Sequence, residues 1–242
     1  MPRFFVEGEP QGEYFLGGED GRHAARALRL RAGEPVTLCD GQGWDYPCTV
    51  LRGEDGGLWL RVEGKTPSLG EPGAKVTVCQ CLPKGDKLET VVQKAVELGA
   101  YEIWPLYSSR CVSRPDPKSM EKKTARLQKI AREAAQQSGR GAVPRVLPAA
   151  KLQEALEAAA GQGTALFFYE AGQGSLKQAL QAAGDRLFLF VGPEGGFAPE
   201  EAELARSLGA EVLTLGRRIL RTETAPLAAL SAIFYEKGDM EL

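Results

Sequence analysis

The feature that most constrains the fold is an uninterrupted apolar run, residues 187–191 (LFLFV), which is followed at once by the loop GPEGGF. Such a run is typical of a strand buried on both faces of a parallel sheet. The loop holds three glycines and a proline, which end the strand abruptly and let the backbone approach a ligand closely. Pro199 then favours a helix up to about Ser207, with Gly209 as its stop. The stretch predicts a strand–loop–helix unit of an α/β domain.

A second unit of the same kind follows. Residues 212–215 form a short apolar run that ends at Gly216, and residues 224–238 have apolar positions at helical spacing. Thr222 or Thr224 is expected to cap that helix. The loop before the helix contains Arg217, Arg218 and Arg221. A helix N-terminus beside arginines attracts carboxylate or phosphate, and three solvated arginines on a loop are the alternative. Ligands of open α/β sheets bind at the carboxyl ends of the strands, so the two loops predict one ligand site.

The rest of the chain predicts two domains. In residues 1–68, short strand patterns separated by glycine-rich and acidic turns predict a small β-barrel, and a helix over residues 21–30 is expected to turn Ala25 and Leu28 inward. Residues 65–73 are expected to form a linker. In residues 73–242, strand patterns alternate with helical ones, which predicts an α/β domain with a mostly parallel sheet. The expected strands are residues 3–7, 35–39, 46–51, 57–63, 75–82, 102–107 and 165–169, and the further helices are residues 86–99, 119–138, 151–160 and 175–183.

The composition narrows the class of protein. The 242 residues show no charged-then-apolar leader and no apolar run near eighteen residues, so neither secretion nor membrane insertion is indicated. Five cysteines, an odd number, favour a reducing cytoplasm over a disulfide framework. Cys79 and Cys81 are interpreted as small buried residues rather than zinc ligands. The single histidine, His23, argues against histidine-based triads and metal sites, and no metal is expected.

Charge is distributed unevenly along the chain. The net charge of −2 alone argues against a nucleic-acid partner. Residues 110–145, however, contain ten lysines or arginines and three acids, and Lys122 and Arg126 share a face of the helix expected there. A second basic face near the N-terminus consists of Arg22, Arg26 and Arg29. A basic segment of this kind usually indicates only a helix face exposed to solvent. Two basic faces together, however, favour RNA as the partner.

Two motifs of this chain resemble the signature of a known family. They are LFVGPEGGF, residues 189–197, and LGRRILRTETA, residues 215–225. Together with residues 82–99 (LPKGDKLETVVQKAVELG) and 129–146 (KIAREAAQQSGRGAVPRV), they are similar to the SPOUT-class RNA methyltransferases, specifically the RsmE family, which methylates N3 of a uracil in small-subunit ribosomal RNA. Further matching segments are residues 105–110, HAARALRLRAGE and DGQG, so the resemblance covers nearly the whole chain.

The resemblance implies a fold and a cofactor. It implies a SPOUT domain with a trefoil knot in residues 73–242, a PUA-like RNA-binding barrel in residues 1–68, and a homodimer whose interface includes the helix over residues 224–236. It further implies that S-adenosylmethionine lies against the two glycine loops and that 16S ribosomal RNA of the small ribosomal subunit is the substrate. The expected cofactor-binding residues are Val191, Gly192, Pro193, Glu194, Gly195, Gly196, Leu215, Gly216, Ile219 and Leu220. The expected RNA-binding residues are Arg3, Arg22, Arg26, Arg29, Arg110, Lys122, Arg126 and Arg140.

The chemistry of such a reaction points to particular side chains. Uracil N3 holds its proton at neutral pH, so the enzyme must remove the proton or stabilise the anion that spreads onto O2 and O4. Arg221 is the expected stabiliser of that anion, and Glu223 is expected to orient Arg221. Glu194 is expected either to accept from a ribose hydroxyl or to cap a helix, and both roles are open.

Other functions are compatible with parts of the sequence. A SPOUT methyltransferase acting on a ribose 2′-hydroxyl would keep the cofactor loops but is expected to lack the N-terminal barrel and residues 136–140. A non-catalytic RNA-binding protein would keep the basic faces alone. A nucleotide hydrolase needs the pattern GxxxxGK[ST] and an ordinary dinucleotide-binding fold needs GxGxxG after a strand, and the sequence has neither.

Overall fold

The computed structural model describes residues 1–241, and these residues form two compact units. Unit 1 consists of Met1–Glu71 together with Ala135–Val143, and unit 2 consists of Pro72–Ala134 together with the chain from Pro144 onward. The chain therefore passes between the units three times. A nine-residue segment from the middle of the chain completes the N-terminal unit.

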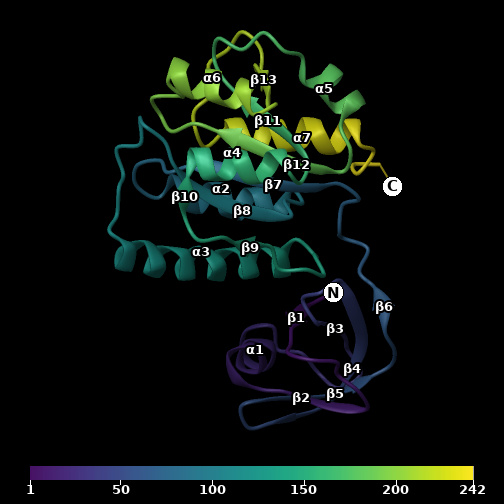
Figure 1. The fold of residues 1–242 in the computed structure, drawn as a ribbon. Coiled ribbons are helices and arrows are strands. Elements are labelled where there is room, and N and C mark those ends of the chain that lie inside the picture. The colour runs from purple at the N-terminus through teal and green to yellow at the C-terminus, as the bar shows by residue number, and fades with distance from the viewer. Residues whose placement is uncertain (242) are drawn as a thin grey trace. The chain divides into compact units, whose positions relative to one another are not determined.

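Unit 1 is a curled, mostly antiparallel sheet around a single core (Figure 1). Its strands are β1 (Arg3–Phe5), β2 (Glu13–Leu16), β3 (Pro35–Cys39), β4 (Trp44–Glu54), β5 (Gly57–Val62) and the short β6 (Thr66–Pro67). They pair in the order β1-β3-β4-β5-β2, with β6 on β4 and a parallel β1–β3 pair. All five strands of the main path supply side chains to the core, from Phe4 to Leu60. This arrangement confirms the barrel-like domain, and it adds the strands β2 and β6 that the sequence pattern did not predict.

The helix expected over residues 21–30 is wrong in its details. An α-helix, α1 (Gly18–Arg22), runs directly into a π-helix over His23–Ala27, in which the Leu28 N–H donates to the His23 carbonyl five residues back. The wider turn changes which side chains point inward. Ala24 is fully buried, whereas Leu28, which was expected to face inward, is 43% exposed.

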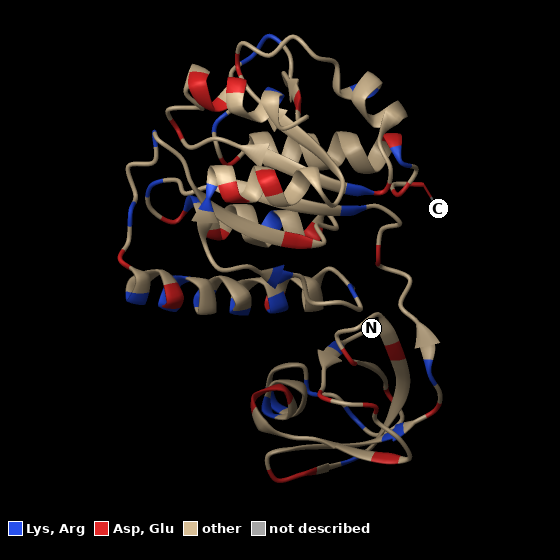
Figure 2. Ribbon diagram, in the orientation of Figure 1, with Lys and Arg blue, Asp and Glu red and all other residues tan. Residues whose placement is uncertain are grey.

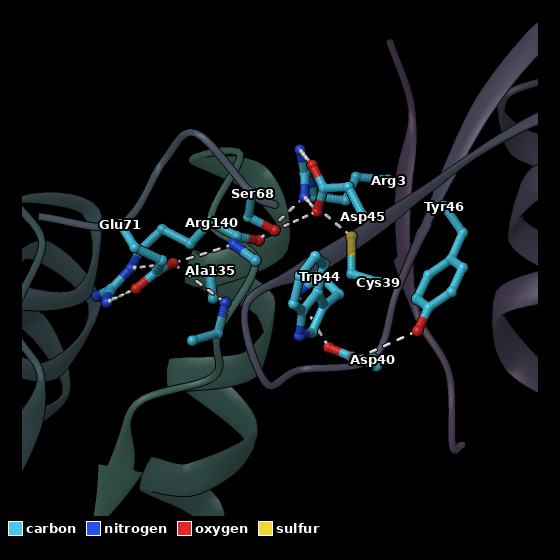
Figure 3. A network of polar contacts seen from close by, with 12 residues as sticks. Arg3, Cys39, Asp40, Trp44, Asp45, Tyr46, Ser68, Glu71, Ala135 and Arg140 are labelled. Atoms are coloured by element: carbon cyan, nitrogen blue, oxygen red, sulfur yellow. Dashed lines mark hydrogen bonds and ion pairs between the residues drawn. The ribbon is translucent and has the colours of Figure 1, made fainter. Parts of the chain in front are cut away.

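Most of the expected linker, residues 65–71 of 65–73, is instead built into unit 1 (Figure 3). Ser68 donates to Asp45, which also binds the guanidinium of Arg3 through two hydrogen bonds of 2.6 and 2.8 Å. Glu71 accepts from the backbone N–H groups of Gly141 and Ala142, each at 3.0 Å, and from the Arg140 side chain at 2.7 Å. Glu71 therefore anchors the segment Ala135–Val143 within unit 1.

Unit 2 is a parallel sheet with helices along it. Its strands are β7 (Lys75–Cys81), β8 (Glu102–Tyr107), β9 (Arg145–Val146), β10 (Ala150–Lys151), β11 (Thr164–Phe168), β12 (Arg186–Val191) and β13 (Glu211–Leu213). Their order is β10-β8-β7-β12-β11-β13, with β9 also on β8. The predicted run over residues 187–191 is the core of β12, which lies between β7 and β11 and is buried on both faces. The α/β class with a mostly parallel sheet is thus confirmed.

The helices of unit 2 connect these parallel strands. They are α2 (Lys87–Glu97), α3 (Pro117–Gln137, whose last three residues belong to unit 1), α4 (Leu152–Ala160), α5 (Leu176–Ala182), α6 (Pro199–Ser207) and α7 (Ala225–Glu236). Helices α2 and α5 both contact α7, which packs on β7 and β12. Right-handed crossovers then require α4 and α6 on the opposite face. The predicted stops are confirmed at α6, which ends before Gly209 in a left-handed conformation (φ +83°).

Pro105 explains a gap at one side of the sheet. It lies inside β8, next to the edge strands rather than at the edge itself. The Leu147 N–H donates to the Ile103 carbonyl, and peptide groups two residues apart on a strand face the same side. The missing N–H of Pro105 therefore faces the break between β9 and β10, where no ladder hydrogen bond is lost.

Candidate active site

A pocket of about 510 Å³ lies at the carboxyl ends of three neighbouring strands of unit 2. It lies where β11, β12 and β13 end, as expected for an open α/β sheet. Its walls come from three segments, residues 168–170 at the end of β11, residues 191–194 and 196 at the end of β12, and residues 214–222 after β13. Lys87 and Ala225, from the starts of α2 and α7, complete the lining. The volume is in the range of small-molecule sites.

Two glycines shape the loop after β12. A Cβ on Gly192 would lie 2.9 Å from the carbonyl carbon of Gly196, which is closer than real Cβ contacts come. Gly196 has φ of +63°, and its N–H donates to the Pro193 carbonyl in a tight turn. Arg110 donates to the Gly195 carbonyl at 2.8 Å and so braces the loop from outside the pocket. The backbone of this loop is thereby held open toward the cavity.

The loop after β13 presents its arginines to the same cavity. Gly216 has φ of +94° and turns the chain, after which Arg217, Arg218 and Arg221 all line the pocket and are exposed. Within residues 1–241, the structure describes no ion pair for any of the three. Ile219, expected to supply apolar contact, lines the pocket but is 88% exposed. The cavity thus combines glycine backbone with free guanidinium groups.

The expected threonine caps of α7 are wrong. Thr224 stands at the N-cap position, but its side chain makes no cap hydrogen bond and its backbone is helical. Thr222 is 6% exposed and its hydroxyl donates to the Gly192 carbonyl at 2.7 Å. The threonine therefore joins the two pocket loops instead of capping the helix.

Lys87 joins both loops at the edge of the pocket. Its Nζ lies 2.7 Å from Glu194 of the first loop and 3.8 Å from Glu223 of the second. Glu194 also accepts from the Lys84 N–H at 3.0 Å. Burial raises the pKa of Glu194, but the hydrogen bonds from Lys87 and the backbone outweigh it and hold the pKa below its usual value. Glu194 is therefore an ionised partner of Lys87, and the two roles expected for it stay predictions.

Glu223 lies beside the pocket rather than in its lining. Its nearest described cation is Lys87, and its buried Oε2 has no hydrogen-bond partner in the described chain. No described contact joins Glu223 to Arg221, so its expected role in orienting Arg221 has no support here.

The pocket does bring together nearly all the predicted cofactor residues. Those that line it are Val191, Gly192, Pro193, Glu194, Gly196, Leu215, Gly216, Ile219 and Leu220, with Gly195 the exception.

Two family models match this chain. One, described as an RNA methyltransferase domain, covers residues 71–234, and the other, an RNA methyltransferase PUA domain, covers residues 16–63. A ribosomal RNA small subunit methyltransferase E from Bacillus subtilis is 35% identical over 98% of this chain and 97% of its own length. The chain belongs to the ribosomal RNA small subunit methyltransferase E family.

Other members of this family agree in sequence and in fold. The enzyme from Mycobacterium bovis is 36% identical over 89% of this chain and 84% of its own length. The crystal structure of the enzyme from Neisseria gonorrhoeae, bound to S-adenosyl methionine, is 34% identical, covers 97% of both chains and superimposes with a TM-score of 0.88. The α/β SPOUT-type architecture with an N-terminal PUA-like domain is therefore the fold of this chain as well.

The basic residues expected to bind RNA fall into two groups. Arg22, Arg26, Arg29 and Lys122 are exposed, and Figure 2 shows further blue segments along α3. Arg126 is also exposed, although it pairs with Glu89 at 2.8 Å. The remaining three have partners inside the protein: Arg3 binds Asp45, Arg110 binds the Gly195 carbonyl and Arg140 binds Glu71. Arg140 is 3% exposed, so its guanidinium is not at the surface, and the expectation of a phosphate contact there is wrong.

Some lining residues were not singled out in the sequence. Phe168 ends β11, the strand between β12 and β13, and Tyr169 and Glu170 follow it. The signal that identifies them is their place directly after a buried apolar run, as for the two glycine loops. Their loop lacks the glycine-rich signature, and the strand order that puts β11 between the other two is not visible in a sequence.

The described residues can also be examined for metal-binding groups and for membrane-spanning helices. Cys79 and Cys81 are fully buried, and burial raises the pKa of both thiols well above its usual value, as expected for neutral core residues. Residues 1–241 contain no group of three or more histidine, cysteine or acidic residues placed to hold a metal ion. In the same residues no helix has the length and apolar character needed to cross a membrane.

Proposed function

We propose that this chain transfers a methyl group from S-adenosylmethionine to N3 of a uridine in 16S ribosomal RNA. The observation that carries the proposal is the pocket at the ends of β11, β12 and β13, formed by the two motifs shared with the methyltransferase E family. The same fold in the Neisseria gonorrhoeae enzyme holds S-adenosyl methionine. The proposal assigns that cofactor to this pocket.

The residues present fit the cofactor. Gly192, where a Cβ would strike the backbone of Gly196, and Gly196, with its positive φ, leave main-chain groups beside the cavity, which suits an adenine and a ribose. Leu215 and Leu220 supply apolar walls. When bound, the cofactor supplies an electrophilic methyl group on a sulfonium. The protein must therefore hold the pocket closed to water and place the accepting atom in line with that methyl.

Arg221 is proposed to act on the uracil. It lines the pocket, is exposed and has no ion-pair partner among the described residues. A guanidinium there stabilises the negative charge that develops on O2 and O4 as N3 loses its proton. Glu223 follows two residues later with an unpartnered buried carboxylate oxygen, and we keep it as a residue that assists at this site.

RNA is proposed to contact both units. Unit 1, matched by the PUA model, offers Arg22, Arg26 and Arg29, and unit 2 offers Lys122 and Arg126 on α3. Lysine and arginine at exposed positions contact phosphates and position the substrate without reading its bases. Ribosomal RNA as substrate follows from the family, and the small subunit from its members' shared name.

We propose that unit 2 carries the trefoil knot and that the chain acts as a homodimer through α7. Helix α7 supports this because it is apolar overall yet leaves Tyr235 68% exposed. All five cysteines are free thiols, in keeping with a reducing cytoplasm.

Transfer of labelled methyl groups tests the proposed function. The purified chain, S-adenosylmethionine carrying a labelled methyl group, and unmodified small-subunit or large-subunit ribosomal RNA would be incubated side by side. Label is expected only in the small-subunit RNA. Label in neither RNA, with RNA still bound, would favour a non-catalytic RNA-binding protein.

A further inference from the structure

Gln80 is a buried polar residue in the middle of unit 2 with no role in the reaction as described so far. It is the penultimate residue of β7 and is fully buried. Strand β7 pairs with β12, and Gln80 lies opposite Val191, the last residue before the first pocket loop. Its side chain therefore starts directly beneath the point where the two loops meet.

The amide nitrogen of Gln80 faces three acceptors. Nε2 lies 2.9 Å from the Cys81 carbonyl, 3.0 Å from the Thr222 hydroxyl and 3.3 Å from the Gly192 carbonyl. A flipped amide would place its oxygen against these acceptors, so the surroundings fix the orientation of the side chain. Oε1 is buried and has no partner in the described residues. All hydrogen bonds described for the Gln80 amide are therefore donated by its NH₂ group.

These contacts join the two loops to the strand. The Thr222 hydroxyl donates to the Gly192 carbonyl at 2.7 Å, which leaves its oxygen free to accept from Gln80. Gly192 and Thr222 belong to different loops, and both line the pocket. Thr222 directly follows Arg221, so fixing Thr222 also fixes the backbone from which the Arg221 side chain extends.

We infer that Gln80 is a positioning residue that holds the two pocket loops in register, and thereby sets the place of Arg221 relative to the first loop. Gln80 does not itself line the cavity, and it reaches the lining only through its hydrogen bonds to Gly192 and Thr222. Its effect on catalysis rests on the proposed function, whereas its effect on the loops does not. A well-packed apolar residue would fill the same space but would leave the loops without this link.

Hydrogen exchange in the cofactor-free chain tests the link itself. Gln80→Met removes the NH₂ group and keeps the length of the side chain. Residues 192–197 and 214–224 should then exchange about tenfold faster or more than in the wild type. The matched control is Thr77→Val, since Thr77 is also fully buried on β7 and its hydroxyl lies 3.4 Å from Glu102, away from the loops. Unchanged exchange in both loops of Gln80→Met would overturn the inference.

Cofactor binding and turnover separate positioning from mere stability. Gln80→Met should weaken S-adenosylmethionine binding in calorimetry and lower kcat by about tenfold or more, at a temperature where the variant is folded. Thr77→Val should lower the melting temperature without either effect. If Gln80→Met has wild-type affinity and kcat, the inference fails. If the wild type itself binds no S-adenosylmethionine, the proposed function fails, and hydrogen exchange alone decides the role of Gln80.

Thr222 provides a second route to the same link. Thr222→Val removes the hydroxyl with little change in shape, whereas Thr222→Ser keeps it and should lose far less affinity. The effects of Gln80→Met and Thr222→Val should be strongly non-additive, because each removes the same connection. Additive losses in the double variant would contradict a shared role. This route remains available should Gln80→Met not fold.

Discussion

At the scale of single residues, the arginines of this chain have two kinds of surroundings. Arg3, Arg110 and Arg140 hold carboxylates or a carbonyl within the protein and serve its structure. The arginines of the pocket, in contrast, extend into the cavity with no described ion pair. Because a free guanidinium keeps its donors for a ligand, the pocket arginines are the better candidates for chemistry.

Replacing Arg221 tests its role in the reaction. Arg221→Ala should lower kcat by about 10²–10³-fold, the usual effect of removing one electrostatic stabiliser, while S-adenosylmethionine affinity stays within severalfold. Steady-state methyl transfer and calorimetry measure the two quantities. Arg206→Ala is the matched control, because Arg206 is an exposed arginine of α6 outside the pocket lining. Wild-type turnover in Arg221→Ala would remove the residue from the mechanism.

Gly192 tests the shape of the first loop. Gly192→Ala should destabilise unit 2 by about 1–3 kcal/mol and abolish cofactor binding, because its Cβ would strike the backbone of Gly196. Thermal unfolding and calorimetry give both values. Gly184→Ala is the control, since a Cβ there meets nothing within 4 Å and its φ is ordinary. Tolerance of alanine at Gly192 would mean that the loop is not held as described.

At the scale of elements, the basic face of α3 predicts how RNA binding depends on salt. Lys122→Ala should weaken binding of small-subunit RNA and reduce the slope of log affinity against log salt by about 0.7–0.9, the loss of one phosphate contact. Titrations at several salt concentrations measure this slope. Lys177→Ala on α5 removes an equally exposed lysine from another helix. Equal effects of the two variants would show that α3 has no special place in RNA binding.

The ion pair within unit 1 predicts a dependence of stability on pH. Burial raises the pKa of Asp45, but hydrogen bonds from Arg3 and Ser68 outweigh it and keep the pKa below its usual value. The pKa of an aspartate carboxyl is about 3.9 in the unfolded chain and lower for Asp45 in the folded chain. The ion pair therefore stabilises the fold above about pH 3.9, and this stabilisation is lost as the pH falls through the lower pKa of the folded state. Below about pH 4 the wild type should therefore lose stability more steeply than Asp45→Asn.

Tryptophan fluorescence during thermal unfolding follows this loss, because Trp44 and Trp59 belong to unit 1. Asp55→Asn is the control at an exposed aspartate of the same unit, and it should keep the wild-type dependence on pH. A wild-type pH profile in Asp45→Asn would show that the pair does not stabilise the unit in this range.

The elements also show what a sequence reveals and what it does not. An uninterrupted apolar run predicted β12, and the signals at Pro199 and Gly209 predicted α6, almost to the residue, because burial on both faces and helix stops act locally. The strand β2 was missed because only Leu16 of its four residues is fully buried. In the helix near the N-terminus, Ala25 packs against the core as predicted, but Leu28 was wrongly expected to face inward because a π-turn shifts the inward side. Thr222 was wrongly expected to cap a helix. Its actual partner, the Gly192 carbonyl, lies thirty positions away along the chain, and a contact over that separation is not visible in the sequence.

At the scale of the whole molecule, the division into units predicts what a truncation does. Every residue that lines the pocket belongs to unit 2. A chain lacking residues 1–71 should therefore bind S-adenosylmethionine within severalfold of the wild type, but should bind RNA weakly. It also loses Glu71, which accepts from the backbone of Gly141 and Ala142.

Limited proteolysis reports on that segment. Residues 135–143 should become a cleavage site in the truncated chain and stay resistant in the full chain, because exposed segments without fixed backbone partners are cut first. Full RNA affinity in the truncated chain would contradict an RNA-binding role of unit 1. Resistance of residues 135–143 to protease would contradict its dependence on the N-terminal unit.

The atom that receives the methyl group is the most direct test of the account. Small-subunit ribosomal RNA treated with the chain and S-adenosylmethionine would be digested to nucleosides and analysed by mass spectrometry against synthetic standards. If N3 is the acceptor, 3-methyluridine should be the single new product, and it should be lost in Arg221→Ala. A 2′-O-methylated nucleoside in its place would keep the fold and the pocket but contradict the proposed chemistry at uracil N3.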